Sequence, residues 1–360
     1  MTARRILLTL HLWLGLAAGI FLIVLGLTGS VIAFENDIDH WMHPELFYVK
    51  AGPQTLPEQG LIRRAEAHVA PARVAAVQVL RGAGFARVMQ TTDGQSVFVN
   101  PYDGAILGTV RGGFAIDPVI GYIHQIHLRL VPNPRDAPQL AAVGKTAVSF
   151  AGLILCLLVP TGLILFWRSR RTTIKWSASW FRVCFDLHHV IGLYASLFLL
   201  IMAFTGILIG FDAGERALYA VTGSGRPANM PRPQSSPAPG DITADRAIEI
   251  ARASIPNASI AGLFLPVNRN GVWTILMRVP EETSETVHSS VAIDRYSGRV
   301  LQVRNFLTYS QGYRLIRFNR SIHTGDIWGL PSHIVASLTS LLLVAMVFTG
   351  LVIWWRKLAS

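Results

Sequence analysis

The chain has 360 residues, a mean hydropathy of +0.41 and only 15% charged residues, which argues against an ordinary soluble protein. Its net charge of +11 does not indicate nucleic-acid binding, because clustered Arg and Lys in so apolar a chain more often mark one side of a membrane. Cys156 and Cys184 form neither a metal motif nor a disulfide framework, and no Cys-x-x-Cys-His occurs, which excludes covalently attached haem. We therefore expect an integral membrane protein that binds no nucleic acid.

Four apolar stretches are long enough to cross a hydrocarbon core of about 30 Å, which takes roughly 20 residues. The first follows basic residues, as in a signal peptide, but it is too long for one and no Ala-x-Ala site follows it, so we expect it to be retained. The expected membrane helices lie within residues 1–34, 146–167, 188–211 and 333–360, the last including a short tail.

Basic residues surround these helices asymmetrically, before the first, in the link 168–187 and after the fourth. The positive-inside rule then predicts that both termini and this basic loop are cytoplasmic. The two large segments, 35–145 and 212–332, are expected on the other side, in the periplasm of a bacterial cell with the helices in its inner membrane.

The chain also contains an internal repeat, in which each half is helix, external segment, helix. The leading helices match as His11-Leu-Trp-Leu-Gly15 and His188-His-Val-Ile-Gly192, and a Thr-Gly pair follows each leading histidine by 17 residues. The closing helices match as Thr161-Gly-Leu-Ile-Leu-Phe-Trp-Arg168 and Thr349-Gly-Leu-Val-Ile-Trp-Trp-Arg356. Because the halves share one orientation, we expect a symmetry axis along the membrane normal.

The external segments repeat as well. Val97-Phe-Val-Asn-Pro-Tyr-Asp-Gly-Ala-Ile-Leu107 parallels Val291-Ala-Ile-Asp-Arg-Tyr-Ser-Gly-Arg-Val-Leu301, and both patterns predict a strand, a tight turn and a strand. A helix is expected before each hairpin, near residues 57–69 and 243–255. We therefore expect two small α+β domains, the second beginning with a mobile Pro-rich linker at 223–240.

Together, the paired His-x-x-x-Gly helices, the Thr-Gly-x-x-x-(Phe/Trp)-Trp-Arg endings and the two Tyr-x-Gly hairpins resemble the PepSY-associated transmembrane helix family over nearly the whole chain. The resemblance implies an α-helical four-helix membrane bundle with two small periplasmic PepSY-like domains. The family includes FoxB-like inner-membrane reductases associated with iron–siderophore uptake. The resemblance therefore also implies an oxidoreductase that acts on ferric siderophores.

Histidines at membrane depth are functional candidates by default. Repeat alignment pairs His11 with His188 at the expected cytoplasmic helix ends, and His127 with His323 on the outer side. Imidazole is a standard axial ligand of haem iron, so two such pairs are what two bis-histidine b-type haems would require. Possible alternate ligands are His124, His189 and His333. His40 and His43 are spaced to bind metal, but a polar exit from the first helix is the better interpretation, and His68 and His288 are expected on the surface of the external domains.

Small residues lie one helical turn beyond the first pair of histidines, at Gly15 and Gly192. A flat porphyrin needs a groove without side chains beside its axial ligand, so we expect these two glycines to line such a groove. The alternative is close helix packing, for which Gly15-x-x-x-Gly19 is equally suited.

A run of aromatic and basic residues precedes the fourth helix. It could dock a ferric siderophore above the outer haem, or it could be an amphipathic segment that lies on the membrane surface. The docking candidates are Tyr309, Tyr313, Arg314 and Arg317.

No Gly-rich nucleotide-binding turn occurs, so the electrons are expected to come from a membrane quinol or a separate cytoplasmic flavoprotein. The leading hypothesis is a b-type haem reductase that passes electrons across the bilayer to periplasmic ferric siderophore and so releases the iron. The alternative hypothesis is a membrane-anchored PepSY protein that binds or inhibits peptidases without redox activity. That alternative leaves the paired histidines unexplained.

Overall fold

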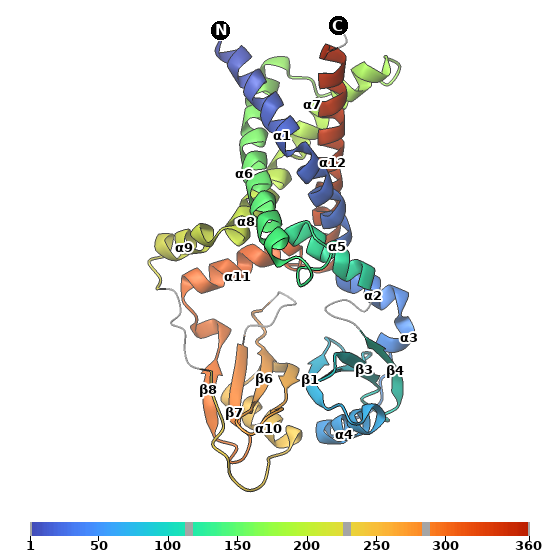
Figure 1. Cartoon of the computed structure of the whole chain (residues 1–360), viewed down its shortest axis with the longest axis vertical. Helices are drawn as coiled ribbons and strands as arrows, with labels where there is room; N and C mark the ends of the chain where they lie inside the picture. Colours follow the sequence, from blue (N-terminus) through green and yellow to red (C-terminus); the bar gives the residue numbers. More distant parts are fainter. Residues whose placement is uncertain (1, 112–117, 226–231, 283–288, 359–360) are drawn as a thin grey trace. The chain divides into compact units, whose positions relative to one another are not determined.

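The computed structural model describes residues 2–111, 118–225, 232–282 and 289–358. They form two compact units, coloured along the chain in Figure 1. The helical unit comprises Met1–Glu35, Val119–Gly225 and Leu315–Ser360, and the sheet unit comprises Asn36–Pro118 and Arg226–Arg314. His288 and part of the expected linker 223–240, residues 226–231, lie outside the described residues.

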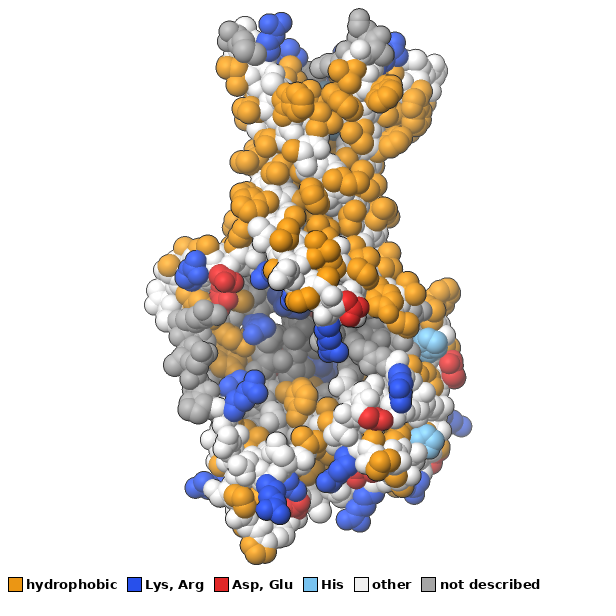
Figure 2. Space-filling view, viewed as in Figure 1, with side chains coloured by type: hydrophobic (Ala, Val, Ile, Leu, Met, Phe, Trp, Pro, Cys, Tyr) orange, Lys and Arg blue, Asp and Glu red, His pale blue; other side chains and the backbone are white. Residues whose placement is uncertain are grey.

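Three described helices are long and apolar enough to cross a membrane: α1 (Ala3–Ile32), α6 (Pro138–Ser169) and α12 (Leu330–Leu358). A fourth crossing arises only if α7 (Trp180–Tyr194) and α8 (Ser196–Gly210) count as one bent span. Figure 2 shows hydrophobic side chains over most of the visible face of these long helices. Such a surface is stable in lipid and unfavourable in water.

The third expected helix differs most from the structure. We expected one helix at 188–211 after a loop at 168–187, but α7 begins inside that loop at Trp180, and the α7–α8 pair bends by 64°. The fully buried Asp186 accepts hydrogen bonds from Arg182 at 2.9 Å and from the Lys175 amide at 3.3 Å, so α7 is bonded to the preceding segment. At the bend, the Ser196 hydroxyl donates to the Leu193 carbonyl, a local bond that favours bending.

Shorter helices complete the helical unit: α5 (Pro118–Arg129), α9 (Asp212–Val221) and α11 (Gln311–Thr324). These belong largely to segments that we expected in the soluble domains. Gly144 allows α6 to lie against the end of α5, because a Cβ at Gly144 would be 1.8 Å from the Arg129 carbonyl oxygen. Gly26 does the same for α1 and α12, since a Cβ there would be 2.7 Å from the Ser340 carbonyl oxygen.

The sheet unit contains one antiparallel sheet in the order β4-β3-β2-β1-β5-β6-β7-β8. We expected two separate domains, but β1 pairs with β5 in the register Val77↔Leu263, so the two four-stranded halves form one sheet. The edge strands would otherwise expose unpaired backbone groups, and pairing them removes that cost. Its strands are β1 (Val74–Val79), β2 (Arg87–Thr91), β3 (Gln95–Val99), β4 (Ile106–Arg111), β5 (Ser259–Phe264), β6 (Val272–Arg278), β7 (Ser289–Asp294) and β8 (Val300–Arg304).

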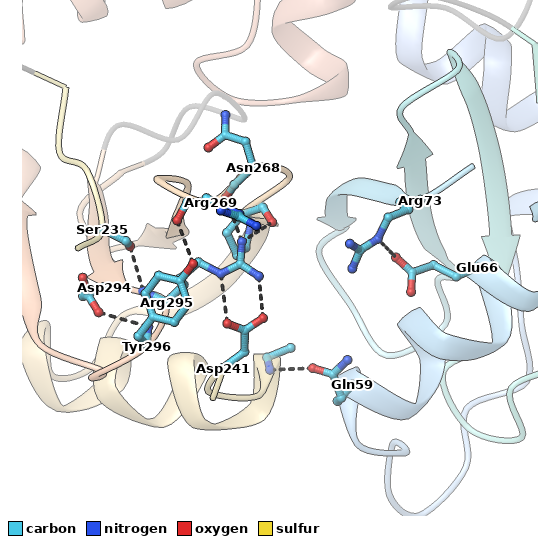
Figure 3. A network of polar contacts seen from close by, with 12 residues as sticks. Gln59, Glu66, Arg73, Ser235, Asp241, Asn268, Arg269, Asp294, Arg295 and Tyr296 are labelled. Carbon is cyan, nitrogen blue, oxygen red and sulfur yellow. Dashed lines mark hydrogen bonds and ion pairs between the residues drawn. The ribbon is translucent and has the colours of Figure 1, made fainter. Parts of the chain in front are cut away.

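Two helices pack on this sheet, α4 (Glu58–Val69) and α10 (Ala244–Ser254), close to the expected 57–69 and 243–255. Each caps the other. Gln59 accepts a hydrogen bond from the Ala244 amide, and Asp245 accepts bonds from the Glu58 and Gln59 amides (Figure 3 includes the Gln59 contact). One hydrophobic core runs beneath both helices. The remaining helices of this region are α2 (Glu35–Met42), α3 (Pro44–Phe47) and the 3-10 helix η1 (Phe306–Thr308).

Both expected hairpins are confirmed, as β3–β4 and β7–β8. Gly104 and Gly298 have φ values of +74° and +71°, which glycine adopts without strain. In each turn the tyrosine two residues earlier donates its hydroxyl to a main-chain oxygen, Tyr102 to Ala83 at 2.7 Å and Tyr296 to Arg269 at 2.9 Å. The repeat in the sequence is therefore a repeat of turn geometry.

Candidate functional site

The structure brings His11 of α1 and His188 of α7 together in the helical unit. Their ring centres lie 6.5 Å apart, and the ring planes are at 90°. Two imidazoles that bind one metal ion from opposite sides, with metal–nitrogen distances of about 2 Å, have ring centres roughly 6 Å apart. The spacing of this first histidine pair therefore fits two ligands of one metal ion.

Both histidines of the first pair are held by the closing helices. The Nδ1 of His11 lies 2.9 Å from the Thr161 hydroxyl of α6, and the Nδ1 of His188 lies 3.0 Å from the Thr349 hydroxyl of α12. In each case the contacted threonine belongs to a Thr-Gly pair of the repeat. The same contact therefore joins α1 to α6 and α7 to α12.

His127 of α5 and His323 of α11, the second histidine pair, make the same contact with the other two Thr-Gly pairs. The Nδ1 of His127 lies 2.9 Å from the Thr28 hydroxyl of α1, and the Nδ1 of His323 lies 3.0 Å from the Thr205 hydroxyl of α8. The Thr205 carbonyl oxygen accepts a further bond from buried Asn319 of α11. Each predicted haem ligand thus has one Thr-Gly partner on another helix.

Burial, with smaller contributions from nearby His323 and His124, lowers the pKa of His127 to about 3. Burial likewise lowers the pKa of His323 to about 4. Both rings are therefore neutral near pH 7 and keep one nitrogen with a free lone pair. Neutral imidazole is the form of histidine that binds metal.

The glycine of each Thr-Gly pair lies against the same histidine ring. A Cβ added at Gly29, Gly162, Gly206 or Gly350 would lie 3.1, 3.2, 3.0 or 3.4 Å from the Cε1 atom of its histidine. At Gly29, Gly162 and Gly206 the distance is shorter than an ordinary van der Waals contact, so a side chain there would make the ring shift, whereas at Gly350 the contact would be an ordinary one. Glycine thus leaves room for the imidazole ring beside the threonine.

The two pairs lie toward opposite ends of α1. His11 and Thr28, the contact of His127, are separated by 17 residues. At 1.5 Å per residue this is about 25 Å of helix. One cofactor therefore cannot bind both pairs, and the helical unit offers two separate sites.

The two glycines predicted to line a porphyrin groove, Gly15 and Gly192, have protein neighbours. A Cβ at Gly192 would be 3.1 Å from the Met346 methyl carbon, and one at Gly15 would be 3.9 Å from Leu158. Gly19, one turn beyond Gly15, packs against Val347 of α12. These contacts favour the helix-packing interpretation for Gly19 and Gly192.

The alternate ligands have other contacts. The Nδ1 of His124 lies 2.5 Å from a carboxylate oxygen of Glu35, and His189 bonds the Phe185 carbonyl oxygen at 2.8 Å. His333 is buried, and its Nε2 lies 3.6 Å from Asp326. The four predicted ligands share the Nδ1–threonine contact, whereas His333 lies beside Gly325 of another Thr-Gly pair, where an added Cβ would be 3.3 Å from its ring.

The docking candidates lie on or just before α11. The rings of Tyr309 and Tyr313 lie 4.3 Å apart, and Arg314 is exposed. The boundary between the two units passes through α11 after Arg314, so Arg317 belongs to the helical unit. Their ring planes are tilted by 48°, so the two tyrosines form a local aromatic cluster.

The sequence analysis did not identify the threonines as partners of the histidines. Thr28, Thr161, Thr205 and Thr349 were visible as repeat motifs, but their histidines lie 99 to 161 residues away in the chain. One signal was available: four of the chain's six Thr-Gly pairs occupy matching positions in the helix repeat, at residues 28, 161, 205 and 349. The four predicted ligands are also related by the repeat, so the two sets could have been matched.

A search of curated proteins finds no match to this chain. The model of the family described as the PepSY-associated TM region matches residues 8–357, which include the four predicted ligands and the four Thr-Gly pairs that contact them. The chain therefore belongs to the PepSY-associated transmembrane family and is an integral membrane protein.

Proposed function

We propose that this protein is a b-type haem reductase of the bacterial inner membrane that passes electrons across the bilayer to ferric siderophore. One observation carries the proposal: four histidines in two separate pairs, all held through Nδ1 by the same Thr-Gly contact. A purely structural role would not require paired imidazoles at two depths of one helical unit.

Haem bound at each pair would supply one-electron redox chemistry. The protein's own part is to present two imidazole nitrogens from different helices and to exclude water from the site. His11 and His188 would hold the haem on the cytoplasmic side, and His127 and His323 the one on the periplasmic side. The separation of about 25 Å along α1 is most of a hydrocarbon core, as a transmembrane path requires.

In this proposal the sheet unit lies in the periplasm, and the four helical spans take their orientation from the basic residues at the chain ends and in the link after α6. A reporter fused after Ser177 should therefore be cytoplasmic, and one fused after Gly240 periplasmic. A third fusion point, Gly113, lies outside the described residues. An external signal from the Ser177 fusion would contradict the orientation of both histidine pairs.

The proposed substrate is an iron complex with hard oxygen ligands. Fe(II) suits such ligands less well than Fe(III), so reduction would release the metal. Tyr309, Tyr313, Arg314 and Arg317 are the proposed docking residues, because neighbouring aromatic rings and the exposed Arg314 guanidinium suit an anionic complex. The donor would be a membrane quinol or a separate cytoplasmic flavoprotein.

The test is a reduced-minus-oxidised spectrum of protein purified from haem-replete cells, with haem extracted by acid acetone and counted. We expect a b-type spectrum, about two haems per chain, and oxidation of the reduced protein by a ferric siderophore. A colourless preparation would contradict the proposal and favour the peptidase-binding alternative.

A further inference from the structure

We propose that the four Thr-Gly pairs that contact the predicted ligands are histidine clamps, in which the threonine hydroxyl sets the tautomer of the haem-binding histidine. The clamps are Thr28-Gly29, Thr161-Gly162, Thr205-Gly206 and Thr349-Gly350. This inference rests on the proposed function for its consequences at haem, but the tautomer itself is a property of the protein without cofactor.

Each threonine hydroxyl has a single proton, so it can donate only one hydrogen bond. In all four clamps the Oγ1 atom lies within 2.7–2.8 Å of the carbonyl oxygen four residues earlier in its own helix. The carbonyl groups belong to Val24, Leu157, Ile201 and Ala345. A carbonyl oxygen only accepts, so the threonine must donate its proton there to make this bond.

A threonine that has donated its proton can only accept at its second contact. The contact at 2.9–3.0 Å then requires that the histidine Nδ1 carries the hydrogen and donates it to Oγ1. The reverse arrangement, in which the hydroxyl donates to Nδ1, would forgo the bond to the carbonyl oxygen. Two bonds are made in the first arrangement and one in the second, so the first is favoured.

The consequence concerns the other ring nitrogen. A neutral imidazole with hydrogen on Nδ1 has its lone pair on Nε2, which is the atom that points away from the threonine. Binding at Nε2 while Nδ1 donates to an oxygen is a common arrangement of metal-binding histidine, and the partner oxygen raises ligand basicity. The clamp therefore prepares each histidine to bind iron through Nε2.

The glycine fixes where the ring lies. The Cε1 atom stands between the two ring nitrogens, and it is the atom nearest to where a Cβ of the glycine would be, at 3.0–3.4 Å. In three of the four clamps a Cβ there would crowd the ring, so the empty space lets the ring lie close to the threonine. Threonine determines the tautomer and glycine determines the position, which accounts for both residues of each pair.

The experiment uses two substitutions of one residue in the full-length protein. Thr161→Val has the same shape and no hydroxyl, whereas Thr161→Ser keeps the hydroxyl and loses only a methyl group. Protein labelled with 15N at histidine is studied first without haem, and the His11 signal is assigned by its loss in His11→Ala. Wild type and Thr161→Ser should have hydrogen on Nδ1 of His11, and Thr161→Val should have lost this preference.

The haem-loaded protein supplies a second readout. We expect Thr161→Val to retain haem at the first pair about 10- to 100-fold less tightly and to raise the midpoint potential of that haem, because a less basic imidazole stabilises Fe(III) less. Thr161→Ser should resemble wild type in both measurements. The haem at the second pair should be unchanged, which controls for general misfolding.

The outcomes separate the two proposals. Wild-type protein that contains no haem when purified from haem-replete cells, but carries the hydrogen of His11 on Nδ1, would overturn the reductase and support the clamp. Haem in wild type, with equal tautomer, affinity and potential in Thr161→Val, would overturn the clamp and leave the reductase standing. A His11 with its hydrogen on Nε2 in wild type would also overturn the clamp.

Discussion

The helical unit and the sheet unit are both built from repeats, but their repeats preserve different things. In the helical unit, four histidine–threonine contacts all measure 2.9–3.0 Å. In the sheet unit the two hairpins preserve turn geometry, while the chemistry of equivalent residues has diverged. Pro101 of the first turn corresponds to Arg295 of the second, and Asn100 corresponds to Asp294.

Arg295 shows how far the second half of the sheet has diverged. Its guanidinium pairs with Asp241, donates to the Asn268 carbonyl oxygen at 2.7 Å and lies over the ring of Tyr296 (Figure 3). Proline at the equivalent position can make none of these contacts. The histidine–threonine contact is thus repeated four times in the helical unit. The two hairpins of the sheet unit share the shape of their turns but differ in the side chains at equivalent positions. This contrast supports the helical unit as the functional part.

The largest expected effect is the loss of a histidine from the helical unit. His11→Ala and His188→Ala should each remove about half of the bound haem, since a bis-histidine site needs both axial ligands. His127→Ala and His323→Ala should remove the complementary half. Haem is counted in purified protein by the pyridine haemochrome method.

The control for these four variants is His68→Ala in the sheet unit. The Nε2 of His68 contacts the Thr109 hydroxyl at an exposed position of the sheet unit, so its replacement should leave the haem content unchanged. Full haem in His127→Ala and His323→Ala would contradict the assignment of the second pair, and His124 and His333 would then be tested next.

The next effect comes from filling the space beside a ring. Gly206→Ala adds a Cβ 3.0 Å from the Cε1 atom of His323, so the ring must shift and haem at the second pair should be bound more weakly. Gly121→Ala on α5 is the matched control, because a Cβ at Gly121 meets no atom within 4 Å. It should favour the helix by up to about 1 kcal/mol. Haem titration of both variants makes the comparison, and equal affinities would argue against a role for Gly206.

A smaller effect is expected for Arg295→Ala in the sheet unit. Loss of its hydrogen bonds should destabilise β6–β8 by about 1–2 kcal/mol, since Asp241 is half exposed and screening weakens the pair. Pro101→Ala should change the first hairpin much less. Amide hydrogen exchange in the full-length protein measures both. Unchanged protection of the second hairpin in Arg295→Ala, relative to wild type, would mean that the arginine contributes nothing to stability.

The smallest effect concerns pH. Burial would raise the pKa of Asp294, but hydrogen bonds from Ser297, Tyr296 and Ser236 outweigh burial and lower this pKa below its ordinary value of 3.8. A carboxyl with a lowered folded-state pKa stabilises the fold above the unfolded pKa. That stability is lost as the pH falls through 3.8 toward the folded pKa.

In Asp294→Asn, the protection of the second hairpin against amide exchange should therefore depend less on pH at acidic pH than in wild type. It should then resemble the first hairpin, where neutral Asn100 accepts a hydrogen bond from the Tyr102 amide at 3.0 Å. Hydrogen exchange between pH 3 and 6 follows both hairpins in one sample (a window set by the ordinary pKa of the carboxyl). An unchanged acid profile in Asp294→Asn would contradict this assignment.

Local pattern in the sequence determined much of this protein. Apolar runs predicted the long helices α1, α6 and α12, because spanning lipid requires continuous apolar side chains. Alternation around Gly104 and Gly298 predicted both hairpins, and repeat alignment paired His11 with His188, which the structure confirms as neighbours. Each of these features depends on residues that are close together in the sequence, or on a motif that the second half of the chain repeats.

Tertiary structure alone decided the rest, since it depends on residues far apart in the chain. The bend between α7 and α8, the pairing of β1 with β5 into one sheet and the mutual capping of Gln59 and Asp245 follow from packing that no local pattern encodes. The threonine of each clamp became recognisable only when folding brought it to its histidine, up to 161 residues away. A hydrogen bond between distant residues leaves no periodic signal, so only the fold reveals it.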